Sequence, residues 1–391
     1  MAAFIPNIVV ALPKPKTHQP LRKPKPTVSC KATQQKSISD VWRKIHGEDD
    51  WAGLLDPMDP LMRSELIRYG EMAQACYDAF DFDPYSKYCG SCRYSPSEFF
   101  DSLDMSHVGY TPTRFLYATA NINLPNLFRK SRWPSKMWSK HANWAGYIAV
   151  SNDAMTKLLG RRDITIAWRG TVTHVEWVAD LMNYLKPISG EGDVKVEAGF
   201  LELYTDKETT CGYCKYSARE QVLAEVKRLL DKYSQEEVSV TITGHSLGSA
   251  MGILSAFDIA ERGLKAGTST VWVVNLVQGL PWCYLHVGVG LELDHKKSPF
   301  LNPNADAASA HNLEAILHLL DGYHGKHGAF KRTSERDLAL VNKDCDFLKD
   351  EHTVPPRWRQ DLNKGMVKTQ DGRWVLADRP KPHDPTQDLH H

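Results

Sequence analysis

The chain has no run of about 18 or more apolar residues, which is the length that a membrane-spanning helix needs. The nearest approach is the stretch 271–291, which is interrupted by Asn275, Gln278, Pro281 and several glycines. We therefore predict a strand followed by an apolar loop there, and no transmembrane segment.

The chain also lacks a strong excess of charge, because its formal net charge is +1 at pH 7. A strongly charged partner such as nucleic acid is not indicated. The balance is uneven, since residues 1–39 contain seven Lys or Arg and no Asp or Glu. A basic, acid-free leader is typical of an organelle transit peptide. We expect residues 1–37 to be a disordered plastid transit peptide, with a basic tail that is never removed as the alternative.

The remaining residues, 38–391, are predicted to form one domain. We expect an N-terminal helical and loop region at 38–140, a catalytic core at 141–330 and a C-terminal extension at 331–391. Residues 51–83 have apolar side chains at helical spacing, including Leu66 and Tyr77, which predicts a helix over this range. The β-rich runs 144–151 and 163–168 are separated by a glycine and two arginines, which predicts paired strands.

A helix–strand–turn–helix unit is predicted between residues 217 and 262. Ser217 and Glu220 form a capping box at the start of an amphipathic helix. The β-branched run 238–243 follows, and then a helix of small residues that ends before Gly263. This order is typical of a parallel α/β unit, so we expect an α/β fold with a central, mostly parallel sheet flanked by helices.

The turn of that unit has the sequence GHSLG at residues 244–248. A nucleophile elbow needs a strand, a sharp turn in which glycines avoid clashes, and a helix, and all three are predicted here. We therefore expect Ser246 to be a catalytic nucleophile. The alternative is a glycine-bounded turn in which the serine is incidental.

A serine nucleophile also needs donors for the oxyanion and a base that accepts its proton. The backbone N–H of Leu247, which follows the serine, is the expected first donor. The run 164–168 leads directly into Arg169-Gly170-Thr171, so Thr171 is the expected second donor. A plain strand-end turn with a surface threonine is the alternative for Thr171.

The base is harder to choose, because the chain has 16 histidines. The order serine, acid, histidine that is usual in α/β-hydrolases favours a late histidine. On spacing alone, four residues compete for the role: His295, His311, His318 and His324.

With GHSLG at residues 244–248 and WRGT at residues 168–171, the chain resembles the class III lipases related to fungal triacylglycerol lipases. Over residues 38–380 it is similar to the plant plastid phospholipase A(1) group, as at DGYHG in residues 321–325. The resemblance implies an α/β-hydrolase fold and His311 as the base. It also implies a lid at residues 173–181, for which a fixed helix is the alternative.

The chain departs from that family between the serine and the histidine. The family has several dozen more residues there, including a strand and the Asp of the triad, so we expect a sheet that is truncated after the elbow helix. The acids that remain between Ser246 and His311 are Asp258, Glu261, Glu292, Asp294 and Asp306. None is assigned to the triad. Loss of that acid costs about 10⁴-fold in rate in the serine proteases, where it fixes the tautomer of the histidine.

Four of the eight cysteines form two CxxC pairs, Cys89–Cys92 and Cys211–Cys214. Such pairs are structural, redox-sensitive or zinc-binding in different proteins. The two pairs lie more than 100 residues apart, so their spacing alone does not support one shared zinc site.

Together these features predict a lipid acyl-ester hydrolase of the phospholipase A(1) type. The expected substrates are sn-1 acyl esters of phosphatidylcholine, galactolipids or triacylglycerol at a membrane or lipid-droplet surface of the chloroplast. The chemistry requires no metal and no cofactor. One alternative is a catalytically weak or inactive lipid-binding relative, because the acid is missing. Another is a hydrolase that its CxxC pairs place under redox control.

Overall fold

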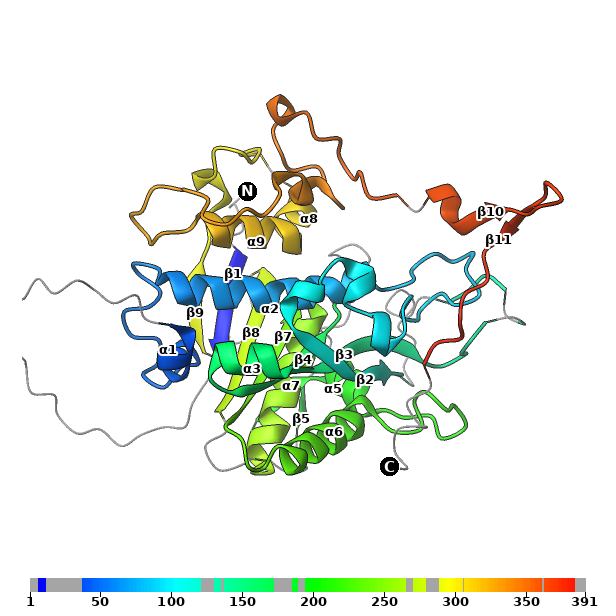
Figure 1. Ribbon diagram of the computed structural model, residues 1–391, viewed down its shortest axis with the longest axis horizontal. Helices are drawn as coiled ribbons and strands as arrows, with labels where there is room; N and C mark the ends of the chain where they lie inside the picture. Colours follow the sequence, from blue (N-terminus) through cyan, green and yellow to red (C-terminus); the bar gives the residue numbers. More distant parts are fainter. Residues whose placement is uncertain are drawn as a thin grey trace, which may run out of the picture.

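The structure is a computed structural model (Figure 1). It describes residues 6–11, 37–120, 130–133, 135, 137–171, 185–188, 194–264, 270–278, 288–304, 306–360 and 362–383. The predicted lid at 173–181 and most of the predicted transit peptide lie outside these residues. Within them, no helix combines the length and the apolar composition needed to cross a bilayer.

A central sheet of seven strands, in the order β2-β3-β4-β7-β8-β1-β9, organises the described part of the chain. Its strands are β1 (Pro6–Ala11), β2 (Tyr110–Ala118), β3 (Asn143–Ser151), β4 (Arg162–Trp168), β7 (Val238–His245), β8 (Thr270–Gln278) and β9 (Val289–Glu292). Two hairpins lie outside it: β5 (Leu185–Pro187) with β6 (Lys195–Glu197), and β10 (Met366–Lys368) with β11 (Trp374–Leu376). Every residue of β3, β4 and β7 is buried, as expected for central strands that are covered on both faces.

The sheet is mixed, which corrects the expectation of a mostly parallel one. Parallel pairing is confined to β4, β7 and β8, and the other neighbours pair antiparallel. The predicted strands at 144–151 and 163–168 are β3 and β4, which pair antiparallel. The seven-residue helix α3 (Asp153–Leu159) that joins them is shorter than a parallel crossover connection requires.

The strand β1 corrects the expectation of a wholly disordered leader. Pro6–Ala11 lies between β8 and β9 and pairs antiparallel with both strands. This is the side of the sheet where the family's additional strand was expected to be missing. Without β1, the facing edges of β8 and β9 would have unpaired backbone N–H and C=O groups. An extended segment of any sequence can form hydrogen bonds with these groups.

Helices cover both faces of the sheet (Figure 1). They are α1 (Ile38–Ile45), α2 (Pro60–Asp78), α3, α5 (Ala198–Thr205), α6 (Ala218–Lys232), α7 (Leu247–Glu261), α8 (Ala307–Ala310) and α9 (Leu313–Gly322). Short 3-10 turns lie at Pro96–Glu98, Asp101–Leu103, Ser106–Val108, His295–Lys297, Leu338–Asn342, Asp350–His352 and Leu362–Gly365. The capping box of Ser217 and Glu220 is present at the start of α6, as predicted.

Alternation along the strands divides the core into two layers. In β4, Ile164 and Ile166 pack toward α5, α6 and α7, whereas Ala167 faces the layer that contains α1, α2 and α9. Successive side chains of a strand point to opposite faces, so each buried strand contributes to both layers. The result is a three-layer α/β/α arrangement, which is the expected α/β-hydrolase type of architecture.

The helix α2 is shorter than predicted for residues 51–83. It begins at Pro60 because Asp59 caps it, accepting from the backbone N–H groups of Leu61 and Met62. Residues 51–59 form turns instead. The C-terminal end of α2 packs near the end of β7, which brings Tyr77 to the predicted active site.

Candidate active site

Ser246 lies at a sharp turn between β7 and α7. Its backbone has φ 58° and ψ −125°, a strained conformation for a residue with a side chain, and the side chain is half-buried. A Cβ atom at Gly244 would lie 2.3 Å from the Gly248 carbonyl oxygen, and one at Gly248 would lie 2.4 Å from the Trp168 carbonyl oxygen. The two glycines of the motif are therefore needed for close backbone contacts, as a nucleophile elbow requires.

The predicted oxyanion loop follows β4 and lies against this turn. A Cβ atom at Gly170 would lie 2.4 Å from the carbonyl oxygen of His245. The guanidinium of Arg169 is buried, stacks 3.7 Å from the centre of the Phe80 ring and donates to the Gly170 carbonyl oxygen at 2.9 Å. In a trans peptide the N–H points opposite to the C=O, so this contact turns the N–H of Thr171 away from Arg169.

Leu247 is buried and is the first residue of α7. The first N–H groups of a helix have no partner within the helix and are available to an anion. Leu247 and Thr171 therefore keep their predicted roles as candidate donors, one on each side of the contact between the two loops.

Tyr77 joins the oxyanion loop to the elbow. Its phenol oxygen accepts from the N–H of Gly170, and its hydroxyl lies 2.7 Å from Nδ1 of His245. At the other side of the ring, Nε2 of His245 lies 2.8 Å from the carbonyl oxygen of His311. A carbonyl can only accept, so Nε2 carries the proton and Nδ1 accepts from Tyr77. Burial holds the pKa of His245 well below its usual value, which keeps this ring neutral.

His311 precedes α9 and packs against the elbow. The centres of the His245 and His311 rings are 4.6 Å apart. Neither ring nitrogen of His311 has a hydrogen-bond partner among the described residues. Burial lowers the pKa of His311 to about 4. The side chain is thus a neutral imidazole with both nitrogens available, which is the state in which a base accepts a proton.

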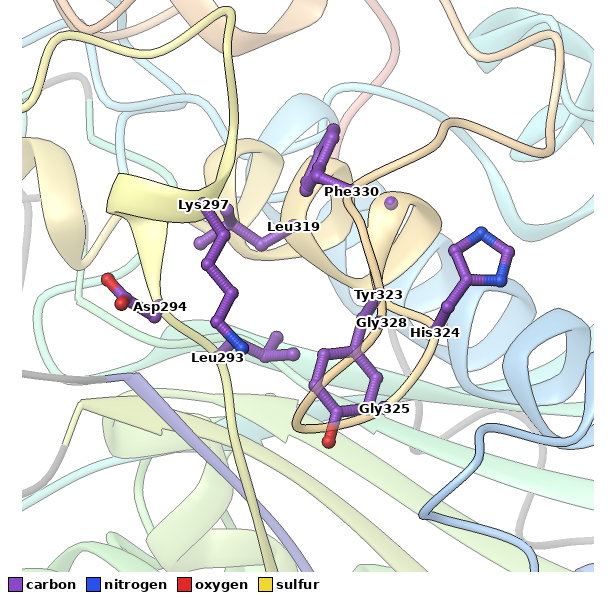
Figure 2. A pocket seen from close by; sticks show the side chains of 10 residues that line it. Leu293, Asp294, Lys297, Leu319, Tyr323, His324, Gly325, Gly328 and Phe330 are labelled. Atoms are coloured by element: carbon purple, nitrogen blue, oxygen red, sulfur yellow. The ribbon is translucent and has the colours of Figure 1, made fainter.

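The three competing histidines have other partners. Their contacts are His295 Nε2 to the Pro303 carbonyl oxygen (3.2 Å), His318 Nε2 to Ser298 Oγ (2.9 Å) and His324 Nε2 to the Lys331 carbonyl oxygen (2.8 Å). His324 lies at the C-terminal end of α9, beside a separate hollow that Asp294, Lys297 and Tyr323 help to line (Figure 2). His311 is the one of the four that contacts His245.

None of the five candidate acids contacts His311. Asp258 is buried and pairs with Arg219, Asp294 caps a 3-10 turn at Lys296, and Asp306 accepts from the N–H of Ser309. Glu261 and Glu292 are exposed at the ends of α7 and β9. Burial is also the one cause of the shifted pKa of His311, with no carboxylate contributing. Within the described residues, the site has a base without an acid partner.

A hollow that is partly open to solvent lies beside Leu247. It is lined by Ala118, Asn143, Ala145, Trp168, Arg169, Leu203, Leu247 and Met251. Most of these side chains are apolar, so the hollow suits a hydrocarbon chain better than a polar group. It lies next to Leu247, the first predicted oxyanion donor.

Sequence reasoning missed Tyr77 and His245 as parts of the site. Helical spacing placed Tyr77 on the core face of its helix, and periodicity does not distinguish a packed phenyl ring from a phenol that forms hydrogen bonds. His245 was visible as the second residue of GHSLG, but its partners lie far away in the sequence. For metals, the described residues contain no group of three His, Cys, Asp or Glu side chains that is placed to bind an ion.

Residues 165–278 match the protein family described as Lipase (class 3). The chain is 54% identical to "Phospholipase A1-Igamma1, chloroplastic" of Arabidopsis thaliana, with 92% of this chain and 84% of that protein covered. It is 38% identical to "Phospholipase A1-II 1" of Oryza sativa subsp. indica, over 88% of this chain and 97% of that protein. The first alignment has 433 positions, more than the 391 residues of this chain, so the relative contains positions that this chain lacks.

Among solved structures, the Lip2 lipase of Yarrowia lipolytica superposes with a TM-score of 0.35 at 16% identity, over 55% of this chain and 58% of that chain. The α/β-hydrolase assignment therefore depends on the sheet, the elbow and the curated relatives rather than on this superposition.

Proposed function

The chain belongs to the class 3 lipase family, and from this premise we propose that it hydrolyses the sn-1 acyl ester of glycerolipids as a phospholipase A(1). Members of a lipase family are carboxylic ester hydrolases, and this chain is one. Phosphatidylcholine, galactolipids and triacylglycerol are the proposed substrates. An inactive lipid-binding role is not favoured by the family membership.

The proposed reaction has two halves. In the first, Ser246 Oγ attacks the ester carbonyl while His311 accepts its proton, and the N–H groups of Leu247 and Thr171 bind the oxyanion. The protonated His311 then donates to the leaving lysolipid. In the second, water attacks the acyl-enzyme and releases the fatty acid.

One observation carries this proposal: a continuous set of contacts joins the three predicted parts of the site. Tyr77 contacts Gly170 of the oxyanion loop and His245 of the elbow, and His245 contacts the main chain of His311. Ser246 is the next residue after His245, so the nucleophile and the base are held by neighbouring groups of one network. The hollow beside Leu247 is partly open to solvent and has a mostly apolar lining, which supports a substrate with an acyl chain.

The missing acid affects the proposed rate. When His311 takes the proton it becomes a buried cation, and no carboxylate among the described residues contacts it. A buried charge without a partner is costly. We expect a slow enzyme, with a kcat up to about 10⁴-fold below that of a lipase with a full triad.

The test compares the full chain with Ser246→Ala on phosphatidylcholine vesicles that carry a labelled sn-1 acyl chain. We expect labelled fatty acid from the unmodified protein and none above the uncatalysed rate from the variant. Ser234→Ala is the matched control, because Ser234 is exposed and lies just after α6. Equal release by all three proteins would exclude the proposed reaction.

We also propose that the protein acts in the chloroplast, at a membrane or lipid-droplet surface. The leader composition and the chloroplastic relatives support this location. Import into isolated chloroplasts, followed by N-terminal sequencing of the imported protein, tests it. A new N-terminus at or before residue 38 supports cleavage of a transit peptide, and failure of import contradicts the proposal.

A further inference from the structure

The second CxxC pair lies in a turn between α5 and α6. The N–H of Cys214 donates to the carbonyl oxygen of Cys211 at 3.3 Å, so the two cysteines are the first and fourth residues of a β-turn. The Cα atoms at these two positions of a turn lie within about 7 Å of each other. A disulfide needs a Cα separation of about 4.4 to 6.8 Å, so the backbone already brings the two residues to bonding range.

The two thiols have unequal environments. Cys214 is fully buried, whereas Cys211 is half-buried and lies 3.5 Å from the hydroxyl of Ser139. A hydrogen bond from the thiol of Cys214 lowers the pKa of Cys211 to about 5. The same contact and burial raise the pKa of Cys214. The half-buried Cys211 thus has the more acidic thiol and lies beside the buried thiol of Cys214, as in dithiols that exchange with disulfides.

The first CxxC pair shows that the spacing alone does not produce this arrangement. Cys89 and Cys92 have exposed fractions of 2% and 3%. Burial raises the pKa of Cys92 to about 12. Buried structural thiols are unreactive, so this pair is an internal control.

The second pair also contacts residues next to the lining of the hollow beside the proposed nucleophile. The thiol of Cys214 forms a hydrogen bond with Thr119, which directly follows Ala118 of the lining. On the other side, the Ser139 hydroxyl that contacts Cys211 accepts from the N–H of Ala142, which directly precedes Asn143 of the lining. The turn thus joins the two strand ends that form one side of the hollow.

We propose that Cys211 and Cys214 are a redox-modification site that exchanges reversibly with an external disulfide. Sγ of Cys211 attacks one sulfur of that disulfide, the S–S bond breaks, and one thiolate leaves. Cys214 then loses its proton and attacks Sγ of Cys211, which releases the second thiolate. Two electrons pass from the cysteine pair to the external disulfide; one released thiolate takes up the proton of Cys214, and the other takes up a proton from solvent. An external dithiol reverses the reaction.

A consequence for catalysis follows and depends on the proposed function. The disulfide replaces the thiol contacts to Thr119 and Ser139, so the wall of the hollow loses two of its side-chain contacts. We expect the KM for a lipid ester to differ at least twofold between the reduced and oxidised protein.

The first experiment measures the thiols directly and needs no activity. The full chain is treated with iodoacetamide at pH 6 and pH 8, and each cysteine is quantified by peptide mass spectrometry. Cys211 is expected to react at pH 6 at more than half its rate at pH 8, while Cys89 and Cys92 stay unlabelled. Cys214→Ala removes the hydrogen bond that lowers the pKa of Cys211. Labelling of Cys211 at pH 6 is therefore expected to fall by about tenfold or more.

The second experiment uses glutathione disulfide as the oxidant and dithiothreitol as the reductant. We expect the peptide that contains both residues to lose two hydrogens on oxidation and to regain them on reduction. No such mass change, or labelling of Cys89 and Cys92 equal to that of Cys211, overturns the proposed site. A redox-dependent KM that persists in Cys211→Ser would overturn the link to catalysis alone. Absent hydrolysis with normal disulfide formation would contradict the proposed function instead.

Discussion

His245 holds the main chain of His311: Nε2 of His245 lies 2.8 Å from the carbonyl oxygen of His311, and their ring centres are 4.6 Å apart. The residue before the proposed nucleophile therefore positions the residue proposed as the base. A triad acid performs a similar task in serine proteases by fixing the orientation of the histidine ring. Here the contact fixes the backbone and leaves the ring nitrogens of His311 without partners.

The Tyr77 hydroxyl is the first test of this network. Tyr77→Phe keeps the ring but leaves Nδ1 of His245 and the N–H of Gly170 without their partner. We expect kcat to fall by about 10- to 100-fold, because a lost buried hydrogen bond costs about 1–3 kcal/mol. KM should change little, since the hydroxyl does not line the hollow.

Kinetics on a soluble ester, with the melting temperature measured in parallel, separate positioning from folding. Tyr110→Phe is the matched control, because its buried hydroxyl donates to Asp163, at the other end of β4 from the oxyanion loop. A KM effect with unchanged kcat in Tyr77→Phe would show that the hydroxyl does not position the reacting groups.

The pH dependence of the reaction tests whether His311 lacks a carboxylate partner. Burial lowers the pKa of His311 to about 4 from an ordinary value of 6.5, so the neutral base persists on acidification until about pH 4. The acidic limb of kcat/KM is therefore expected near pH 4. A carboxylate beside the ring would stabilise the charged form and raise that midpoint. An acidic limb at pH 6.5 or above would thus reveal an acid partner.

The same pKa has a consequence for stability. Between pH 6.5 and 4 the unfolded chain binds a proton at His311 that the folded protein does not, so the free energy of unfolding decreases as the pH falls through this range. The decrease from this residue is at most about 3.4 kcal/mol. His318, whose pKa burial also lowers to about 4, acts in the same direction. Urea unfolding of His311→Asn is expected to show a smaller loss over this range than the unmodified protein.

A substitution at Gly170 tests the close contact between the oxyanion loop and the elbow. In Gly170→Ala, the added Cβ would lie 2.0 Å from the Tyr77 hydroxyl and 2.4 Å from the His245 carbonyl oxygen. One of these groups has to move, so we expect kcat/KM to fall by about 100-fold or more, with a lower melting temperature. Gly290→Ala is the control, since nothing lies within 4 Å of a Cβ there. Wild-type kinetics in Gly170→Ala would show that the oxyanion loop is not held as described.

Local patterns in the sequence predicted the local structures well. The capping box of Ser217 and the GHSLG turn depend on residues a few positions apart, and both have the expected geometry. The start of α2 was placed less well, because the local cap at Asp59 sets it at Pro60, whereas apolar spacing alone extended the predicted helix to residue 51. The role of Tyr77 depends on a partner 168 residues away, which no local pattern contains.

The position of Pro6–Ala11 illustrates the same limit at the level of the sheet. Its composition indicated a leader, since charge and proline content are properties of the segment alone. Its pairing depends on two strands near residues 270 and 290 whose edges are otherwise unpaired. The partners of this segment lie far away in the sequence, so no property of the segment alone indicates the pairing.

Removal of residues 1–36 distinguishes a structural role of β1 from a role of the leader in targeting alone. If β1 stabilises the sheet, the shortened protein loses the backbone hydrogen bonds to β8 and β9 and exposes two edges. We expect a lower melting temperature and more aggregation. If the leader is only a targeting signal, the melting temperature stays the same.

A point substitution separates the strand from the rest of the leader. Val9 pairs with Asn275 on one side and Gly290 on the other, so Val9→Pro removes a backbone N–H from the middle of the sheet. Thr27→Pro, outside β1, is the control. A drop in melting temperature in the first variant and not in the second shows that β1 is part of the folded protein. A chloroplast protease that removes residues 1–36 would then also remove the strand next to the edge of the sheet, so the mature enzyme would need another extended segment between β8 and β9.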